Sequence, residues 1–473
     1  MFLKSTRRGP MGCCAALLLV ACGGGSSGED PPSAGPAPPL GDVGPPSPVI
    51  VDESGVPASS ESRRFAITDV TVVPMDRETS IPGQTVLIED GRITFIGNAD
   101  IAAIAPDAVR LDGTARYLMP GLIDMHAHLV TDSGAEHDLV LELAAGVTTV
   151  RIMWGSEIHL GWRGAIRDGS LLGPSLFVAS PGLEGEPPYW PGSIVVDSAA
   201  EARAAVRTQH TAGYDFIKVY NRLQLEPYLA ILDEADTLGM RVVGHVPAAL
   251  TADFVIDSGQ HTIEHFSRYA AEVTDTGDWS GRIDGSRLTA LIERIRLRET
   301  WSCPTLTVQS RSKAQVTAIK SNPLYALLSQ PMREWLDSPL TQPAAGDRTV
   351  ADSRRKEVLA AFAEAGVGLL AGTDTGVLYV LPGFSMHEEL RHFAIAGLTP
   401  YQALRAATFD AAAALESADR GAITLGLRAD LLLLDADPLE DIANVNRRVG
   451  VMAGGRWFAQ STLMAMAGNG AGP

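Results

Sequence analysis

Cysteine is scarce in this chain of 473 residues and is concentrated at one end. Three of the four cysteines, Cys13, Cys14 and Cys22, lie within the first two dozen residues, and the fourth is Cys303. A single cysteine in the rest of the chain excludes a disulfide framework as the basis of the fold. Because Cys303 has no basic neighbour in the sequence, we expect a buried, unreactive thiol at this position.

Basic residues are also few, since 38 Lys and Arg stand against 56 Asp and Glu and give a net charge of −18. The chain has no long basic run that could follow a phosphate backbone, which excludes nucleic acid as an expected partner. Charged residues make up 20% and hydrophobic residues 45% of the chain, a balance typical of a globular protein. The length allows one large domain or two to three ordinary ones.

A short apolar segment at residues 11–21 follows three basic residues and is too short to cross a bilayer. This pattern indicates a secretory signal peptide. The sequence Leu19-Val20-Ala21-Cys22 resembles the lipobox of bacterial lipoproteins, in which the peptide is cleaved before a cysteine that is then lipidated. We therefore expect an exported bacterial lipoprotein, anchored in the cell envelope by lipid at Cys22. An ordinary signal peptide with a chance cysteine is the alternative.

Composition and hydrophobic patterning divide the rest of the chain. Gly, Pro and Ser dominate the stretch after the signal, and short alternating runs around Asp90-Gly91 then predict hairpin strands. Farther on, apolar strands alternate with helix-length amphipathic stretches, as in a parallel β/α barrel. The expected segments are a signal peptide at 1–21, a disordered tether at 22–62, the first part of a small β domain at 63–117, the barrel at 118–414, the second part of the β domain at 415–460 and a tail at 461–473.

Side chains that can bind metal follow several of the expected barrel strands. His126 and His128 end an apolar strand, and their spacing of two places both imidazoles on one face. His245, His265 and Asp374 end other strands. Because the carboxyl ends of barrel strands meet at one mouth, we expect these four imidazoles and one carboxylate to converge there. They are ligand types that suit zinc or a similar divalent ion.

Lys218 lies inside an apolar strand at residues 216–220, where a buried ammonium is costly unless it is paired or discharged. Alternatively, its apolar stem extends to the rim and leaves the charge in water.

Tyr220, two residues later, points the same way and could hydrogen-bond a substrate carbonyl or a developing oxyanion, or simply pack in the barrel. Arg151 could bind a substrate carboxylate, or form a salt bridge within the scaffold.

Together these residues resemble the amidohydrolase superfamily of metal-dependent hydrolases. Its signature is matched by Pro120-Gly121-Leu122-Ile123-Asp124-Met125-His126-Ala127-His128, and the resemblance extends from residue 63 to about residue 458. It implies a TIM-like (β/α)8 barrel with a small β-sandwich formed by both termini. It also implies that an N-carboxylated Lys218 joins two divalent metal ions, with zinc as the expected metal. The first ion would be bound by His126, His128 and Asp374, and the second by His245 and His265.

The chemistry that the resemblance implies is hydrolysis by a metal-activated hydroxide. Two divalent ions that share a water lower its pKa toward neutrality and place hydroxide beside a polarised carbonyl. By resemblance, Asp374 is the catalytic residue that accepts the proton and passes it to the leaving nitrogen. The hydroxyls of Thr373 and Thr375 are candidates to hold this carboxylate in place.

The substrate class follows from the same resemblance. Residues 216–220 and 244–247 are similar to those of imidazolonepropionase-like and prolidase-like enzymes, which points to a small-molecule amide such as a dipeptide or an N-acyl amino acid. The alternatives are a deaminase or a cyclic-amide or lactone hydrolase with one metal ion, and a catalytically silent surface-binding protein. The sequence leaves open whether the chain forms a homo-oligomer.

Two stretches are expected to wall the mouth of the barrel. Aromatic residues on loops after barrel strands, Trp154 and Tyr189-Trp190, could line an apolar substrate pocket or simply pack beneath long loops. The connection at residues 306–355 exceeds an ordinary link between barrel elements and is expected to cover part of the mouth.

Overall fold

The computed structural model describes residues 64–344 and 346–470. The expected signal peptide, the tether and the lipidation residue Cys22 lie outside the described residues. Within the described part of the chain, no helix is both long and apolar enough to cross a membrane.

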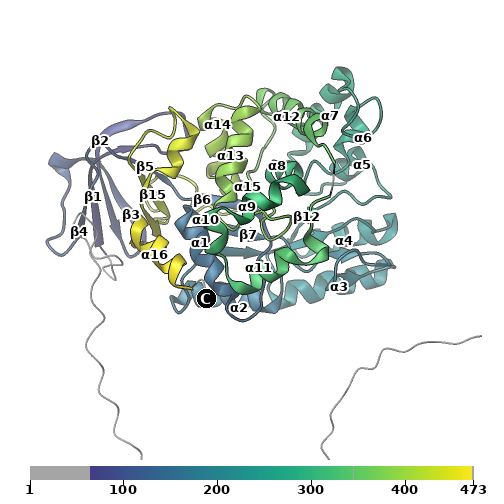
Figure 1. The fold of residues 1–473 in the computed structure, drawn as a ribbon, viewed down its shortest axis with the longest axis horizontal. Coiled ribbons are helices and arrows are strands. Elements are labelled where there is room, and N and C mark those ends of the chain that lie inside the picture. Colours follow the sequence, from purple (N-terminus) through teal and green to yellow (C-terminus); the bar gives the residue numbers. More distant parts are fainter. Residues whose placement is uncertain (1–63, 345, 471–473) are drawn as a thin grey trace, which may run out of the picture. The chain divides into compact units, whose positions relative to one another are not determined.

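Strands from the first and last parts of the described chain form one eight-stranded sheet (Figure 1). Its strands are β1 (Arg64–Val72), β2 (Ile81–Glu89), β3 (Arg92–Asn98), β4 (Val109–Asp112), β5 (Tyr117–Pro120), β15 (Leu431–Leu434), β16 (Arg448–Ala453) and β17 (Arg456–Ala459). The order is β17-β16-β15-β5-β1-β2-β3, and β4 pairs with β1. The antiparallel pair β5–β15 joins the two halves, as expected for a β domain built from both ends.

The hairpin between β2 and β3 turns at Asp90-Gly91, where both residues have positive φ angles, 48° and 75°. This is the two-residue turn that the sequence predicted, and glycine favours it because it lacks a Cβ. Alternate residues of the strands point into one apolar core, and the buried set includes Phe65, Ile67, Val86, Ile88, Leu431 and Leu433.

The remaining strands run parallel in two sheets. The first has the order β6-β7-β8 and the second β10-β9-β11-β12-β13-β14. Their bounds are β6 (Leu122–Ala127), β7 (Val147–Ile152), β8 (Ser175–Val178), β9 (Leu183–Glu184), β10 (Ile194–Val195), β11 (Phe216–Val219), β12 (Arg241–Gly244), β13 (Thr262–Glu264) and β14 (Trp301–Cys303).

Three isolated parallel bridges connect these two sheets and the segment around Asp374. The pairs are Ala179 with Phe216, Ser302 with Leu369, and Ala127 with Thr375. The strand expected at residues 369–371 is therefore reduced to one bridge, supplemented by backbone hydrogen bonds such as that from Met125 N to Ala371 O, at 3.0 Å.

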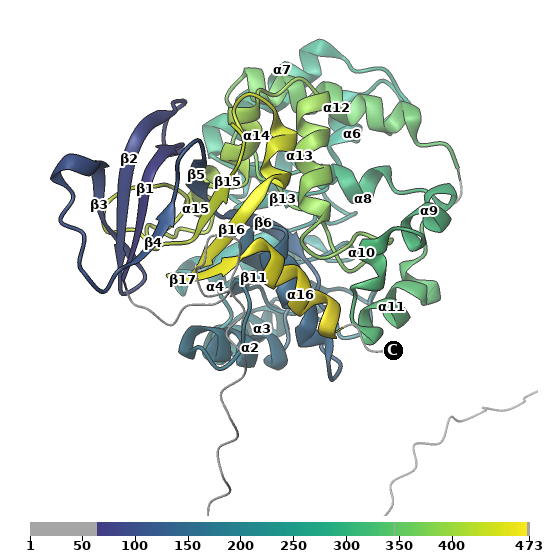
Figure 2. The same cartoon turned by 60° about the vertical axis from the view of Figure 1, so that its left-hand side comes forward.

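Helices alternate with the parallel strands and cover them (Figure 2). They are α1 (Asp138–Ala144), α2 (Glu157–Asp168), α3 (Ala199–Ala212), α4 (Leu225–Thr237), α5 (Ala252–Asp257), α6 (Tyr269–Val273), α7 (Gly285–Arg298), α12 (Thr349–Glu364), α13 (Ser385–Ile395), α14 (Pro400–Ala406) and α15 (Phe409–Ala414). Between β14 and α12 the chain forms four short helices, α8 (Leu306–Ser310), α9 (Val316–Lys320), α10 (Pro323–Ala326) and α11 (Gln330–Asp337).

The segment expected to be a tail is instead a helix, α16 (Gln460–Gly470), which packs against α1. Leu463 and Ala467 lie four residues apart, on one face, and both are fully buried. The side chain of His137 contributes through Nε2, which lies 2.9 Å from the carbonyl oxygen of Ala467. Burial of this small apolar face explains why the helix forms in a sequence that lacks strong charge patterning.

Candidate active site

Three of the predicted metal ligands lie within 4 Å of one carboxylate at the ends of the parallel strands, and a fourth packs against them. His128 Nε2 lies 2.9 Å and His126 Nε2 3.3 Å from Oδ1 of Asp374, and His265 Nδ1 lies 3.9 Å from Oδ2. The ring centroids of His126 and His265 are 4.6 Å apart, and those of His265 and His245 are 4.7 Å apart. Residues separated by up to 248 positions in sequence therefore share one site, as the strand-end argument predicted.

Glycines flank Asp374 where the backbones approach closely. A Cβ on Gly372 would lie 2.5 Å from Cys303 Sγ and 2.9 Å from His126 N. A Cβ on Gly376 would lie 2.0 Å from the carbonyl oxygen of His128. Asp374 itself has a φ angle of 60°, in the region that costs energy for residues other than glycine. The tight contacts hold this conformation and aim the carboxylate at the imidazoles.

Lys218, the sixth predicted ligand, is only 1% exposed, so its side chain does not extend to the rim. Its Nζ is buried without a hydrogen-bond partner, and so is Nε2 of His126. Burial lowers the pKa of Lys218 to about 8, against the opposing effect of the nearby Glu264 and Asp374 carboxylates. Two buried polar atoms without partners, in a ring of nitrogen and oxygen donors, fit a site that holds divalent cations.

Hydrogen bonds at Nδ1 orient two of the imidazoles. His265 Nδ1 lies 2.6 Å from the hydroxyl of Thr305, whose own hydrogen is donated to Pro304 O at 2.8 Å. The hydroxyl oxygen must therefore accept a hydrogen bond from Nδ1–H of His265. His245 Nδ1 likewise lies 2.8 Å from Oδ1 of Asn221. In both rings the lone pair is left on Nε2, which is the atom available to a metal.

Glu264 orients the imidazole of His126 in the same way, because its Oε2 lies 2.7 Å from Nδ1 of that ring. Its other oxygen accepts a hydrogen bond of 2.8 Å from Nη2 of Arg151. Burial alone would raise the pKa of Glu264, but Arg151 and the bond to His126 outweigh it and hold the pKa well below its usual value. The carboxylate is thus ionised and holds the imidazole firmly.

Arg151 does not reach the substrate side of the site. It is fully buried, and its guanidinium also donates to Met125 O at 2.6 Å and to Thr262 Oγ1 at 3.3 Å. Of the two roles that the sequence allowed for Arg151, the structure shows the salt bridge within the scaffold rather than a substrate contact.

Burial also sets the charge of the ligands. It lowers the pKa of His265 to about 3, that of His245 well below its usual value, and that of His128 as well. For Asp374, burial acts to raise the pKa, but His265 and His126 outweigh it and hold the pKa well below its ordinary value. Neutral imidazoles and an ionised carboxylate are the forms that bind metal.

The two threonines beside Asp374 act on the backbone rather than on its carboxylate. Thr373 Oγ1 donates to Oδ2 of Asp124 at 2.6 Å, and Thr375 Oγ1 donates to Val380 O at 3.0 Å. The expectation that these hydroxyls hold the Asp374 carboxylate is therefore wrong, because both are already donated elsewhere. They fix the chain on either side of the residue instead.

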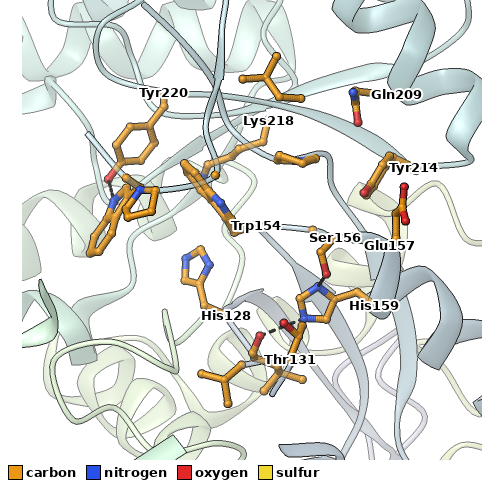
Figure 3. A pocket seen from close by; sticks show the side chains of 18 of the residues that line it. His128, Thr131, Trp154, Ser156, Glu157, His159, Gln209, Tyr214, Lys218 and Tyr220 are labelled. Carbon is orange, nitrogen blue, oxygen red and sulfur yellow. Dashed lines mark hydrogen bonds between the residues drawn. The ribbon is translucent and has the colours of Figure 1, made fainter. Parts of the chain in front are cut away.

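A cavity of about 750 Å³ opens beside these ligands (Figure 3). Five of the six predicted ligands line it, all except His126, and so does Tyr220. Aromatic side chains form much of its wall, namely Trp154, Trp190, Tyr220 and Trp335. The cavity therefore combines one polar, ligand-rich end with largely apolar walls, as small-molecule sites do.

Two distant segments supply the aromatic wall. Trp190 Nε1 donates a hydrogen bond of 2.8 Å to the Tyr220 hydroxyl. The loop that carries Trp190 is fixed by Glu184, whose carboxylate accepts a hydrogen bond of 2.8 Å from Tyr189 N. Trp335 belongs to α11, and its Nε1 donates to Gly376 O at 2.7 Å, two residues from Asp374. The long connection after β14 thus covers part of the site, as the sequence predicted.

Several residues of the site could not be singled out from the sequence. Glu264, Asn221 and Thr305 fix three imidazoles, but only Glu264 had a signal, its position next to His265. His159 also lines the cavity, with Nε2 3.0 Å from Leu129 O. Cys303 is fully buried, and burial raises the pKa of its thiol well above the usual value, as expected of an inert side chain.

Known proteins resemble the chain in fold along most of its length and in sequence over shorter segments. The putative prolidase from Bifidobacterium longum superimposes with a TM-score of 0.66 at 26% identity, covering 86% of this chain and 99% of that protein. The adenine deaminase of Ruegeria pomeroyi is 26% identical over 162 residues, 29% of this chain and 27% of the relative. The imidazolonepropionase of a Bradyrhizobium species is 42% identical over 60 residues, 12% of this chain and 15% of the relative.

The chain thus spans about a quarter or less of the length of these two curated relatives. The sequence profile of the amidohydrolase family, in contrast, matches residues 117–458 and takes in all six predicted ligands. The chain therefore belongs to the amidohydrolase family of hydrolases, whose members include enzymes that act on carbon–nitrogen bonds.

Proposed function

We propose that this protein is a metal-dependent hydrolase that cleaves the carbon–nitrogen bond of an amide at a binuclear centre. The observation that carries the proposal is the convergence of six donors at one end of the cavity, with Nζ of Lys218 and Nε2 of His126 buried among them and engaged in no hydrogen bond. Membership of the amidohydrolase family supports it.

The scaffold of this centre is proposed to be a (β/α)8 barrel. The parallel segments β6, β7, β8, β11, β12, β13 and β14, with residues 369–371, follow one another through ladders and the three parallel bridges. The bridge from Ala127 to Thr375 links the last segment to the first, which is the closure that a barrel requires.

The residues suited to two divalent ions are His126, His128 and Asp374 for one, and His245 and His265 for the other, with a carboxylated Lys218 between them. Zinc is the expected ion, and bound ions of this kind polarise a carbonyl and lower the pKa of water. Carboxylation would convert the buried amine into an anionic ligand, which removes the cost of an unpaired buried ammonium.

Side chains of the protein would carry out the proton transfer and bind the carbonyl oxygen. Asp374 is placed to accept a proton from the attacking water and to pass it to the leaving nitrogen. The Tyr220 hydroxyl accepts its hydrogen bond from Trp190, so its own proton is free to be donated to a carbonyl oxygen. The aromatic walls exclude bulk water and strengthen both interactions.

The similarity to a putative prolidase supports an amide as the bond cleaved. The sequence predicted a dipeptide or an N-acyl amino acid as the substrate. Both compounds carry a free carboxylate, so the charges that line the cavity affect whether either can bind.

A deaminase or cyclic-amide hydrolase with one metal ion is the second candidate. It is favoured by the compact trio His126, His265 and Asp374, whose ligand atoms all lie within 4.8 Å of one another. The similarity to an adenine deaminase supports it also. Lys218 would then remain an ordinary amine.

Metal content and turnover together test the proposal. The full-length protein is prepared with zinc and bicarbonate, and metal per chain is measured beside the hydrolysis of an amide library. Nearly two ions per chain with release of amine supports the proposal, whereas one ion with release of ammonia from purines, or with ring opening of cyclic amides, supports the second candidate. Lys218→Ala should lose metal and activity together, and full activity in that variant would refute the bridging lysine.

We also propose that the protein is a lipoprotein of the cell envelope, on the basis of the sequence ending in Cys22. The native protein should partition into the detergent phase of a phase separation, and Cys22→Ser should move to the aqueous phase. Retention of the variant in the detergent phase would refute the anchor.

A further inference from the structure

The charges that line the cavity restrict the groups that the substrate can carry, an inference that rests on the proposed amide-hydrolase function. Away from the predicted ligands, the lining bears two carboxylates, Asp132 and Glu157. Neither side chain forms an ion pair or a hydrogen bond with any other residue that the structure describes. Both residues are exposed at the rim, where water screens their charges in part. With no cation beside them, they still make this part of the cavity unfavourable for an anion.

The arginines around the cavity are already engaged. Arg151 is fully buried against Glu264. Arg163 pairs with Asp215 at 2.6 Å and also donates to the backbone, and Arg222 donates to the backbone and stacks over an aromatic ring. Among the described residues that line the cavity, Lys218 is the only lysine or arginine, and it lies with the predicted metal ligands. We call the part of the cavity away from the predicted metal ligands the distal part. A substrate carboxylate bound there would lose water without gaining a cation to pair with it.

The walls favour a different kind of group. Trp154 and Tyr220 meet edge to face with ring centroids 5.5 Å apart, and Trp190 is bonded to the Tyr220 hydroxyl. Rings in this arrangement accept a flat apolar group, and beside carboxylates they also tolerate a positive charge.

One neutral polar group faces the distal end. Gln209 is 7% exposed, it lines the cavity with Tyr214 beside it, and its side-chain amide has no partner among the described residues (Figure 3). A buried amide without a partner can donate to and accept from a neutral polar ligand group. Its position indicates that the distal part of the cavity receives part of a substrate.

We propose that the substrate is an amide whose larger portion, seated between the aromatic walls, is aromatic or otherwise apolar and carries no free carboxylate. Water adds across the carbon–nitrogen bond, which yields a carboxylic acid and the free amine. This assigns the enzyme to amides of simple amines and of blocked amino acids, rather than to dipeptides or N-acyl amino acids with a free carboxylate.

A matched pair of amides tests the assignment. N-acetyl-2-phenylethylamine and N-acetyl-L-phenylalanine share the acetyl group, the amide and the phenyl ring, and differ only in the carboxylate. With the zinc-loaded full-length protein, kcat/KM for the amide without the carboxylate should be higher by about 100-fold, because the carboxylate would be desolvated without a partner. Equal or inverted values would overturn the assignment.

Binding separates this inference from the proposed function. The dissociation constants of the two compounds are measured by calorimetry with the same protein. If neither compound is hydrolysed, the amide-hydrolase function fails for this class, and the ratio of dissociation constants still decides the charge preference. At least tenfold tighter binding of the phenylethylamine compound supports the inference, and tighter binding of the carboxylate overturns it.

Charge reversal provides a second test. In Glu157→Lys the preference for the compound without a carboxylate should shrink by about fivefold or more, because a cation now faces the distal part. The matched control is Glu226→Lys, which makes the same change at an exposed residue in the first turn of α4, outside the cavity lining. The control should retain the parent preference. An unchanged preference in Glu157→Lys contradicts the electrostatic account.

Discussion

Removal of the Thr305 hydroxyl tests how the site fixes its ligands. The hydroxyl is fully buried, accepts a hydrogen bond from His265 Nδ1 at 2.6 Å and donates one to Pro304 O at 2.8 Å. Thr305→Val removes it while the β-branched shape is kept, which matters because the residue has a φ angle of 48°. His265 then loses the partner that keeps its proton on Nδ1 and its lone pair on Nε2.

The expected loss can be worked from this single contact. Loss of such an outer hydrogen bond weakens metal binding by about 10- to 100-fold, or about 1.4 to 2.8 kcal/mol. The ion bound by His245 and His265 should show this loss, since Thr305 bonds no other predicted ligand. Zinc affinity is measured by competition with a chromophoric chelator, in parallel with turnover.

Thr305→Ser is the control, because it retains the hydroxyl and should bind zinc nearly as well as the parent. Thermal unfolding of the metal-free variants separates a local effect from general destabilisation. Zinc affinity within twofold of the parent in Thr305→Val would refute the reasoning that the hydroxyl sets the tautomer of His265.

Three further variants probe packing, protonation and the wall of the cavity. Gly372→Ala should destabilise the protein by about 1 to 3 kcal/mol, seen as a lower melting temperature, since its Cβ would lie 2.5 Å from Cys303 Sγ; an unchanged melting temperature contradicts this. Burial lowers the pKa of His159 from 6.5 to about 4, so the stability it contributes above pH 6.5 is lost as the pH falls toward 4. His159→Gln should abolish about 2 kcal/mol of the loss between pH 7 and 4.5, as measured by urea unfolding, whereas parallel curves would refute it. Trp335→Ala should raise KM about tenfold with zinc content unchanged, and an unchanged KM would exclude Trp335 from the substrate wall.

Much of the candidate metal site could be predicted from sequence because strand geometry is local. Alternation along a strand places His126 and His128 on one face, and the ends of parallel strands share one edge, so His245, His265 and Asp374 could be brought together without coordinates. The hairpin at Asp90-Gly91 was predicted for the same kind of reason, a turn that two adjacent residues specify.

Hydrogen bonds and salt bridges between side chains far apart in sequence could not be predicted in this way. The sequence allowed Arg151 either a substrate carboxylate or a salt bridge, and only packing against Glu264 decided the choice. Thr373 was expected to hold a ligand carboxylate, yet its hydroxyl is donated to Asp124, which lies 249 residues away in sequence. A hydrogen bond depends on positions to within a few tenths of an ångström, and no spacing rule carries that information.

The sequence by itself therefore determined the family, the alternation of parallel strands with helices and the donor set of the predicted centre, because each follows from short-range periodicity and residue chemistry. Tertiary structure alone decided which nitrogen of each imidazole is free, which arginines are already paired and which charges face the cavity. These properties arise from contacts between remote segments, and they are the properties that bear on the choice of substrate.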